Sequence, residues 1–311
     1  MTPTAEDAAS LASGFGLAVE SARPAAAGFS GAFVFRVDDR NGRSWAARFW
    51  PDEADPRRVS SLHRFVATVA ADGLGDVIAV PQVNARGHSI VRACGRAAQV
   101  EPWLPGQPAD GPLNAAQTDA VAEVLARLHA AAARAASPGC PWFGRRTAAS
   151  PSLVQRAAAA ERLLESPPAG EAAAVRLLRA VMPELRRASR EAVELVPCVR
   201  DLWSDSVLFE GDRVSAVIDL SAARVDQPEG DLARLFGSFA DRDVRVMPAL
   251  LDRYAHRRAF DAPLVRTFDR VGVALSLLLW RERIAAGMVD EDDPAVAARV
   301  DHFRRRVAAL L

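Results

Sequence analysis

The spacing of apolar and polar residues predicts a β-hairpin early in the chain. Residues 32–37 and 44–50 alternate apolar and polar side chains as strands do, and residues 39–42 separate them. This short connection contains Asn41 followed by Gly42, a pair that tolerates the positive φ angles of tight hairpin turns. We therefore expect two antiparallel strands joined at this turn.

The remainder of the first hundred residues is expected to complete a sheet with one helix. Within residues 55–71, apolar side chains recur at helical spacing at Val59, Leu62, Phe65, Val66 and Val69. Short apolar runs at 77–80, 89–93 and 97–101 predict further strands. The first part of the chain is therefore expected to be rich in β-structure.

A change of pattern near residue 105 divides the chain. Proline and glycine punctuate it there, at Pro102, Pro105, Gly106 and Pro108. Beyond this linker, helical spacing covers 115–136, 153–165, 172–187 and most of the chain from residue 230 onward. The pattern predicts an α+β fold of two lobes, a β-rich lobe at 1–104 and a larger helical lobe at 105–311.

One segment inside the helical half has β character again. Residues 207–209 form a short apolar strand, 210–212 a turn and 214–218 a returning strand, which predicts a second hairpin. Asp201 precedes the first strand and Asp219 directly follows the second. The two carboxylates are therefore expected at the same open end of the hairpin, where they converge on one site.

Composition limits the classes of function. Of the 311 residues, 50% are apolar and 25% are charged, which is typical of a globular protein with a real core. The 39 Lys and Arg residues, all of them Arg, balance the 39 Asp and Glu residues. This zero net charge provides no general attraction to nucleic acids or anionic membranes, so neither partner is expected.

The cysteines and apolar runs suggest a cytoplasmic protein. Three widely spaced cysteines, Cys94, Cys140 and Cys198, match neither a disulfide framework nor zinc-ligand spacing. The N-terminal residues 1–20 lack the basic region of a signal peptide. The longest apolar run, 271–280, has about half the ~20 residues that span a bilayer, so we expect a buried helix there.

The chain contains candidates for each group that phosphoryl transfer from ATP requires. Glycines in the segment Gly28, Phe29, Ser30 and Gly31 would let backbone amides approach a phosphate. Arg48 in the next strand supplies a cation, and Asp201 and Asp219 supply two carboxylates. Taken alone, the glycine segment also fits a simple turn, and Arg48 also fits a strand arginine with its head in solvent.

Four motifs carry a resemblance to a known family. They are the segments 199–209 (VRDLWSDSVLF), 217–220 (VIDL), 226–233 (DQPEGDLA) and 125–129 (LARLH). Their sequences and order over residues 25–290 resemble the aminoglycoside phosphotransferase family, which includes choline kinase-like enzymes. The resemblance implies a bilobal protein-kinase-like fold, ATP and Mg²⁺ as cofactors, and a small hydroxyl-bearing substrate. It does not indicate which acceptor or which oligomeric state.

The resemblance also implies roles for individual residues. Asp201 would orient or deprotonate the substrate hydroxyl, and Asp219 would hold Mg²⁺ against the phosphates. The segment from Glu101 through Trp103 to residue 104 would be the hinge that binds adenine through its backbone. Asp231 would cap its helix and brace the catalytic loop.

The chain departs from the family pattern at several positions. Val199 replaces the His of the catalytic loop, and Ser206 replaces its metal-binding Asn, with Asp205 next to it as a possible compensating ligand. Arg48 replaces the strand Lys, which changes reach and geometry. His63 occupies the helix position where the partner Glu of that Lys is expected, so we expect no ion pair between strand and helix.

These departures leave more than one function open. The first hypothesis is an ATP- and Mg²⁺-dependent kinase of a small molecule. The alternative is a catalytically impaired kinase-like protein that binds a nucleotide, a metabolite or a partner protein without phosphoryl transfer. A hydrolase using Asp201 and Asp219 as an acid pair is a third interpretation, disfavoured because the chain has a single Tyr and no aromatic cluster for sugars. The Arg-rich end, Arg299 to Arg306, is expected to be a solvated helix face.

Overall fold

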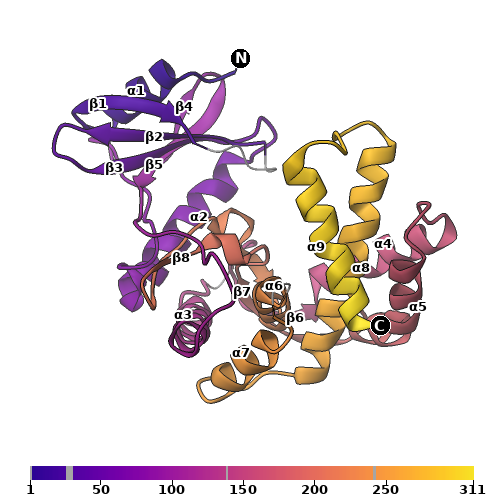
Figure 1. The fold of residues 1–311 in the computed structure, drawn as a ribbon. Coiled ribbons are helices and arrows are strands. Elements are labelled where there is room, and N and C mark those ends of the chain that lie inside the picture. Colours follow the sequence, from indigo (N-terminus) through magenta and orange to yellow (C-terminus); the bar gives the residue numbers. More distant parts are fainter. Residues whose placement is uncertain (1, 26–30, 138, 241–242) are drawn as a thin grey trace. The chain divides into compact units, whose positions relative to one another are not determined.

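The computed structural model describes residues 2–25, 31–137, 139–240 and 243–311. These residues form two compact units (Figure 1). The N-terminal unit contains Met1–Pro108 and Ser206–Ser221, and the helical unit contains Ala109–Asp205 and Ala222–Leu311. The expected α+β fold class is confirmed, with β-structure concentrated in the first unit and helices in the second.

A five-stranded antiparallel sheet is the centre of the N-terminal unit, in the order β1-β2-β3-β5-β4. Its strands are β1 (Val19–Pro24), β2 (Phe33–Asp39), β3 (Ser44–Phe49), β4 (Val91–Ala93) and β5 (Arg96–Pro102). The first predicted hairpin is confirmed as β2 and β3. Its turn is closed by Asp39, whose Oδ1 accepts hydrogen bonds from the amides of Asn41 and Arg43, each at 2.9 Å.

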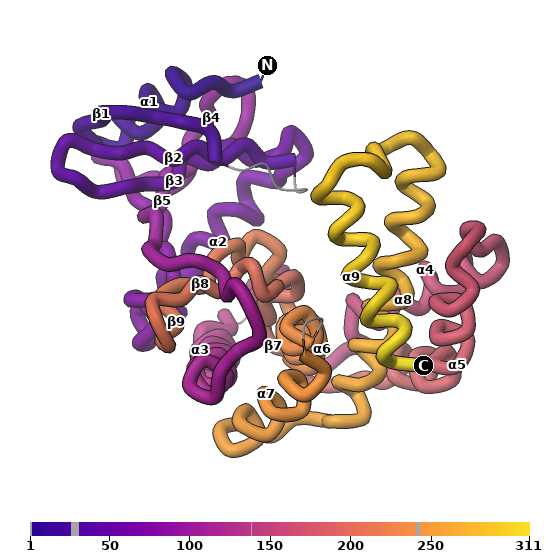
Figure 2. The backbone as a smooth tube through the Cα atoms, viewed as in Figure 1, coloured from indigo at the N-terminus to yellow at the C-terminus, as the bar shows by residue number. Residues whose placement is uncertain are grey.

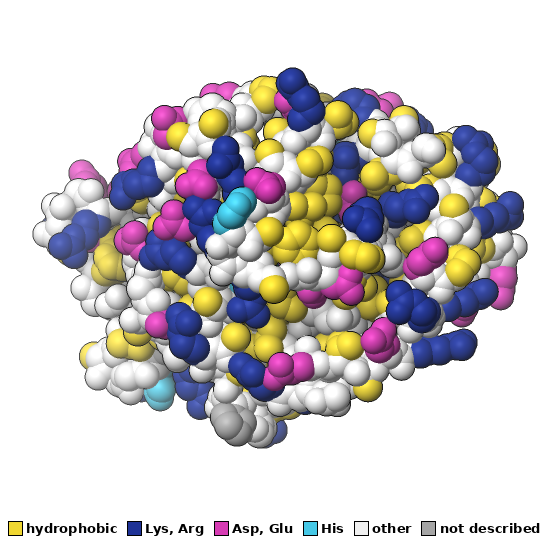
Figure 3. Space-filling view, turned by 90° about the horizontal axis from the view of Figure 1, so that it is seen from below, with side chains coloured by type: hydrophobic (Ala, Val, Ile, Leu, Met, Phe, Trp, Pro, Cys, Tyr) yellow, Lys and Arg dark blue, Asp and Glu magenta, His cyan; other side chains and the backbone are white. Residues whose placement is uncertain are grey.

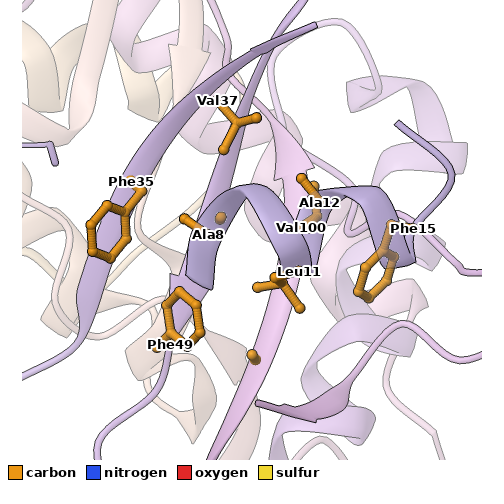
Figure 4. Close-up of a cluster of buried hydrophobic side chains, with 10 residues drawn as sticks. Ala8, Leu11, Ala12, Phe15, Phe35, Val37, Phe49 and Val100 are labelled. Carbon is orange, nitrogen blue, oxygen red and sulfur yellow. The ribbon is translucent and has the colours of Figure 1, made fainter. Parts of the chain in front are cut away.

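One face of this sheet is covered by α1 (Ala5–Gly14), a helix that the sequence analysis did not predict. Thr4 and Asp7 form a capping box at its start, which satisfies amides that the first helical turn leaves unpaired. The apolar side of α1 packs on β2, β3 and β5 (Figure 4). The buried cluster consists of Ala8, Leu11, Ala12, Phe15, Phe35, Val37, Ala47, Phe49, Ala98 and Val100.

The opposite face of the sheet packs against α2 (Pro56–Val69), which is followed by a short π-helical turn (Ala70–Leu74). Successive side chains of a strand point to opposite faces. Ala98 and Val100 of β5 face α1, and the intervening Gln99 contacts His63 of α2. The predicted helix 55–71 is confirmed. The predicted strand 77–80 is wrong, because only Ile78 makes a bridge, to Val217.

The second predicted hairpin is also confirmed, as β8 (Val207–Glu210) and β9 (Arg213–Val217), flanked by short 3-10 turns at Ser204–Ser206 and Leu220–Ala222. The sequence analysis assigned it to the helical lobe, whereas the structure groups it with the N-terminal unit. Backbone bonds explain this: Phe209 pairs with Gln107, and the Val217 amide donates to the Val77 carbonyl at 2.7 Å.

Gly106, close to this hairpin, cannot carry a side chain without displacing its neighbours. Its φ is +106°, and an added Cβ would lie 2.1 Å from Ser215 Oγ and 3.0 Å from the Phe209 carbonyl oxygen. We expect Gly106→Ala to lower the free energy of unfolding by about 1–3 kcal/mol. Thermal melts would show this, with Gly111→Ala as the control, since an added Cβ there meets nothing within 4 Å. Equal melting temperatures for the two variants would contradict the prediction.

The helical unit contains seven helices in its described residues. They are α3 (Ala115–Arg134), α4 (Pro151–Glu165), α5 (Ala172–Ala188), α6 (Glu229–Phe239), α7 (Val246–Ala255), α8 (Ala262–Ala285) and α9 (Pro294–Leu310). Helix α8 is central, since α4, α5, α6 and α9 all pack on it. Figure 2 shows α8 and α9 running side by side in opposite directions. The predicted helices 115–136, 153–165 and 172–187 are confirmed, with ends shifted by one or two residues.

A small antiparallel sheet within the helical unit was not predicted. Its strand order is β10-β7-β6, with β6 (Arg146–Ala149), β7 (Ala192–Cys198) and β10 (Arg224–Asp226). The sequence analysis predicted only helices beyond the linker up to residue 187 and no strand between 136 and 153, where β6 lies. Four residues provide no periodicity, and the partner β7 lies more than 40 residues further along the chain.

The described surface mixes both signs of charge. On the face that Figure 3 displays, Arg side chains are interspersed with acidic ones, in keeping with the balanced composition. Among the helices of the described ranges, none is both long enough and apolar enough to cross a bilayer.

Candidate functional site

The open end of the β8–β9 hairpin brings Ser206 and Asp219 together. Val207 pairs with Val217, and the Ile218 amide donates to the Ser206 carbonyl at 2.9 Å, so the residues flanking the strands are neighbours. Asp219 has a φ of +61°, in the left-handed region that non-glycine residues rarely occupy. Such backbone strain is concentrated at functional sites. The Oδ1 of Asp219 accepts a hydrogen bond from Ser221 Oγ at 2.7 Å.

Arg48 on β3 points toward two carboxylates rather than into solvent. Its NH2 lies 3.7 Å from Glu101 Oε1, and its NH1 lies 4.0 Å from Asp219 Oδ1. The side chain of Arg48 is 14% exposed. The interpretation of Arg48 as a solvent-facing strand arginine is therefore wrong. The pairing places a permanent positive charge next to Asp219, within the N-terminal unit.

A buried polar network holds Glu101 in place. Gln99 donates to Glu101 Oε2 at 2.7 Å, and the Oε1 of Gln99 accepts from Trp50 Nε1 at 2.7 Å and lies 2.8 Å from His63 Nε2. Burial raises the pKa of Glu101, opposed by the charge of Arg48. Burial also lowers the pKa of His63, which favours the neutral ring. His63 is thus a packed, hydrogen-bonded histidine.

The acidic partner of Arg48 comes from a strand and not from α2. Helix α2 contains no Asp or Glu that could pair with Arg48. The sequence analysis did not identify Glu101 as the acidic partner of Arg48. The alternation of side chains along β5 accounts for this pairing. Arg48 lies directly opposite Gln99 in the sheet, and the side chains of Gln99 and Glu101, two residues apart, point to the same face. Glu101 therefore faces the same side as Arg48.

The residues expected to contact the nucleotide are only partly described. Gly28 and Ser30 lie outside the described residues, and Gly31 is exposed with a φ of +70°. The Trp103 amide donates to the Ser44 carbonyl at 3.0 Å, so sheet pairing uses that donor. The guanidinium of Arg36 lies 5.5 Å from the centre of the Trp103 ring. The hinge segment is thereby anchored to β3.

Asp201 lies in a loop of the helical unit and is accessible, with its side chain 58% exposed. Trp203 Nε1 donates to Asp201 Oδ1 at 2.9 Å, and Arg234 Nε lies 3.8 Å from the same oxygen. Asp205 belongs to the same unit, where its carboxylate lies 3.7 Å from Arg299. Asp205 is thus engaged by an arginine.

Asp231 of α6 fixes the backbone that leads to Asp201. The Asp231 side chain is 1% exposed. The Asp231 carboxylate accepts hydrogen bonds from the amides of Val199 and Arg200, at 2.7 and 2.6 Å, and contacts His129 Nε2 at 3.1 Å. Arg200 has a φ of +72°, which these bonds stabilise. The expected bracing of the loop is observed. The expected helix cap is wrong, because α6 begins at Glu229 and Asp231 bonds to the loop instead.

The donor set fits a magnesium ion held partly by a substrate. Within the described residues, no group of three or more His, Cys, Asp or Glu side chains gathers as a metal cluster. Mg²⁺ is commonly held through one or two carboxylates together with substrate phosphates and water. Asp219 supplies a carboxylate of this kind at the hairpin end, where the backbone of Ser206 is its neighbour.

Comparison with solved structures supports the fold. Spectinomycin phosphotransferase in complex with ADP and spectinomycin superposes with a TM-score of 0.72, at 12% identity over 100% of this chain and 98% of that one. The macrolide 2'-phosphotransferase of Brachybacterium faecium gives a TM-score of 0.64, at 20% identity over 96% of this chain and 97% of that one. The protein-kinase-like fold is therefore confirmed.

Sequence comparison identifies the family. Homoserine kinase from Pseudomonas aeruginosa is 32% identical over 225 residues, which are 67% of this chain and 66% of the relative, just under two thirds of its length. The family model described as "Phosphotransferase enzyme family" matches residues 21–268. This range includes the hairpin, Asp201 and Asp231, and the expected resemblance to aminoglycoside phosphotransferases is confirmed. The chain belongs to the phosphotransferase enzyme family.

Proposed function

We propose that the protein transfers the γ-phosphoryl group of ATP to the hydroxyl of a small molecule. The observation that carries the proposal is the end of the β8–β9 hairpin, where Asp219 is held in a strained conformation within 4.0 Å of Arg48. A carboxylate and a guanidinium together suit a metal-bound triphosphate. Relatives with this fold include amicoumacin kinase, solved with AMP-PNP and Ca²⁺.

Each candidate residue has a role in this proposal. Asp219 and Ser206 would hold Mg²⁺, which when bound neutralises charge on the phosphates. Arg48, braced by Glu101, would contact the phosphates as a delocalised cation. Asp201 would orient the acceptor hydroxyl and take its proton. Trp203 positions that carboxylate through its Nε1 hydrogen bond.

The remaining contacts to the nucleotide are assigned from the order of the residues along the chain. Gly28, Ser30 and Gly31 would cover the phosphates with backbone amides. The segment containing Trp103 would face the adenine with groups other than the Trp103 amide, which is already bonded to Ser44. The three cysteines are free thiols, in keeping with a reducing cytoplasm where ATP is abundant.

A second candidate function follows from the ligands that the site lacks. Asp205 contacts Arg299, and Ser206 offers one hydroxyl where the family has an amide, so the metal has few strong ligands from the chain. A protein that binds ATP without transferring its phosphoryl group fits this observation. Release of ADP in the presence of acceptors separates the two functions, because only the kinase shows it.

The nucleotide site is tested first by thermal melting. Because a ligand that binds only the folded state stabilises it, about 2.7 kcal/mol is expected at ATP concentrations near 100 times Kd. We expect Mg²⁺-ATP to raise the melting temperature by roughly 5–10 °C, and Asp219→Ala to abolish this shift. Glu53→Ala, an exposed acid of the same unit, is the control and should retain the shift. An unchanged response in Asp219→Ala would refute the assigned metal ligand.

A further inference from the structure

The helical unit contains a pocket of unusual charge. It is a small pocket between α4, α6, α8 and α9 that is partly open to solvent. Three guanidinium groups line it, those of Arg156, Arg234 and Arg306. Asp269 is the one carboxylate among its lining side chains, all of which are described. Three positive charges against one negative charge leave an excess of two.

The carboxylate of Asp269 is already paired with one of the three arginines. Arg306 NH2 donates to both oxygens of Asp269, at 2.9 and 2.8 Å. Arg306 is 4% exposed, and its Nε–H is buried without a hydrogen-bond partner. An unpaired buried donor costs about 1–3 kcal/mol. Gly237 allows this close packing, since an added Cβ would lie 2.7 Å from Asp269 Oδ1.

The other two arginines have no carboxylate partner in the pocket lining, and Arg234 has Asp201 as a partner just outside it. Arg156 donates to the Phe268 carbonyl at 3.2 Å and lies over the Phe268 ring, 5.0 Å from its centre. Arg234 lies over the Trp203 ring, 4.6 Å from its centre. Burial, together with the neighbouring Arg234, lowers the pKa of Arg156 to about 9, so the group remains charged at neutral pH. Two partly buried guanidinium groups thus face one cavity.

The pocket is next to Asp201. Trp203, which lines the pocket, donates to Asp201 Oδ1, and Arg234, also in the lining, lies 3.8 Å from that oxygen. A small molecule held by the guanidinium groups would therefore have its other end close to Asp201. This is the arrangement needed for a molecule with an anionic group at one end and a hydroxyl at the other.

We propose that the phosphate acceptor is a small hydroxyl-bearing anion, whose carboxylate or phosphate ester is bound by Arg156 and Arg234. This inference rests on the proposed function for its acceptor hydroxyl. Arginine binds both kinds of oxyanion through paired N–H donors, and desolvated partners strengthen such bonds. The same charge repels polycations, because like charges brought together in a partly buried site cost several kcal/mol. We therefore expect an amino sugar with several ammonium groups to be a poor acceptor.

Binding of matched compounds without ATP tests this assignment. The probes are glycerate, glycerol 3-phosphate, neutral glycerol and cationic serinol, which share a three-carbon hydroxylated scaffold. L-homoserine and 3-aminopropan-1-ol form a second pair that differs by one carboxylate. By calorimetry on the full chain, we expect each compound with a carboxylate or phosphate group to bind at least about 10-fold more tightly than its counterpart without one. Tighter binding of glycerate would indicate that the pocket favours a carboxylate, and tighter binding of glycerol 3-phosphate would indicate a phosphate ester.

Variants of α4 provide the matched control. Arg156→Gln is expected to weaken binding of the anions by about 10- to 100-fold, with partial recovery in Arg156→Lys. Arg162→Gln, on the same helix, removes a surface pair with Glu282 at 2.6 and 2.8 Å and should leave anion binding unchanged. Melting curves of all three variants show whether each is folded.

The outcomes separate this inference from the proposed function. Neutral or cationic probes that bind as tightly as the anions would overturn the anionic acceptor, as would anion binding unaffected by Arg156→Gln. Absence of binding by every anion up to about 50 mM would also overturn it. The Mg²⁺-ATP melting shift depends on Asp219 of the N-terminal unit and is measured without any acceptor, so it reports on nucleotide binding and not on the acceptor. Release of ADP in turn reports on phosphoryl transfer.

Discussion

Replacing Asp201 with Asn is expected to reduce kcat by about 10²- to 10⁴-fold, the contribution typical of a positioned general base. The amide keeps the size of the side chain and an oxygen that accepts from Trp203 Nε1, so the loop should keep its conformation. It cannot take a proton from the acceptor hydroxyl. Because Asp201 is 58% exposed, the substitution should change stability by less than about 0.5 kcal/mol.

The measurement is ADP release with the anionic acceptor that gives the highest turnover. The melting shift with Mg²⁺-ATP should persist in Asp201→Asn, because the proposed metal ligands Asp219 and Ser206 are intact. Asp301→Asn, another exposed acid of the helical unit, is the control for loss of a surface charge. Turnover of Asp201→Asn equal to that of the unaltered protein would exclude Asp201 as the base.

The parts of the fold that local sequence determines were predictable. The β2–β3 hairpin follows from strand alternation and from Asn41 with Gly42 in its turn, and the β8–β9 hairpin from two short apolar runs around a glycine. In both cases the information lies within about twenty residues. Helix α1 was equally local, since Thr4 and Asp7 form its capping box; the signal existed and was not read as a helix start.

The parts that depend on distant contacts were not predictable from pattern. Strands β6 and β10 are short and have no periodicity, and each exists because it pairs with β7. Residues 77–80 have the apolar pattern of a strand, but only Ile78 finds a partner, Val217, with which it forms an isolated bridge. Pairing across such sequence distances is decided by tertiary packing.

In the candidate site, too, some residues could be proposed from local sequence and others depend on contacts between distant residues. Asp201 and Asp219 could be proposed as site residues from local pattern, because Asp219 directly follows the returning strand of the predicted hairpin and Asp201 precedes its first strand. Arg306 was expected on a solvated helix face, which is wrong: it is buried against Asp269, 37 residues earlier in the chain. An arginine-rich helix has no local mark that separates a buried guanidinium from an exposed one, since the difference lies in the partner. The pocket that Arg306 lines therefore became visible only in the packing of α4, α6, α8 and α9.

Replacing Asp231 with Asn is expected to destabilise the protein more than any other single site substitution proposed above. The buried carboxylate accepts from the amides of Val199 and Arg200 and contacts His129. An Asn side chain presents one acceptor oxygen, and its NH2 group would face a backbone or ring donor. Leaving buried donors unpaired should lower the free energy of unfolding by about 2–4 kcal/mol, or the melting temperature by roughly 5–15 °C.

The loss should reach beyond stability, because these bonds fix the backbone that leads to Asp201. Arg200 at φ +72° is one residue before Asp201, and without the carboxylate it can relax to an ordinary conformation. At a temperature well below its melting point, Asp231→Asn should therefore show reduced kcat with an unchanged Mg²⁺-ATP shift. Asp252→Asn, an exposed acid of α7, should show neither effect. Normal kcat in a destabilised Asp231→Asn would mean that Asp201 is positioned by Trp203 and Arg234 and does not depend on the loop backbone.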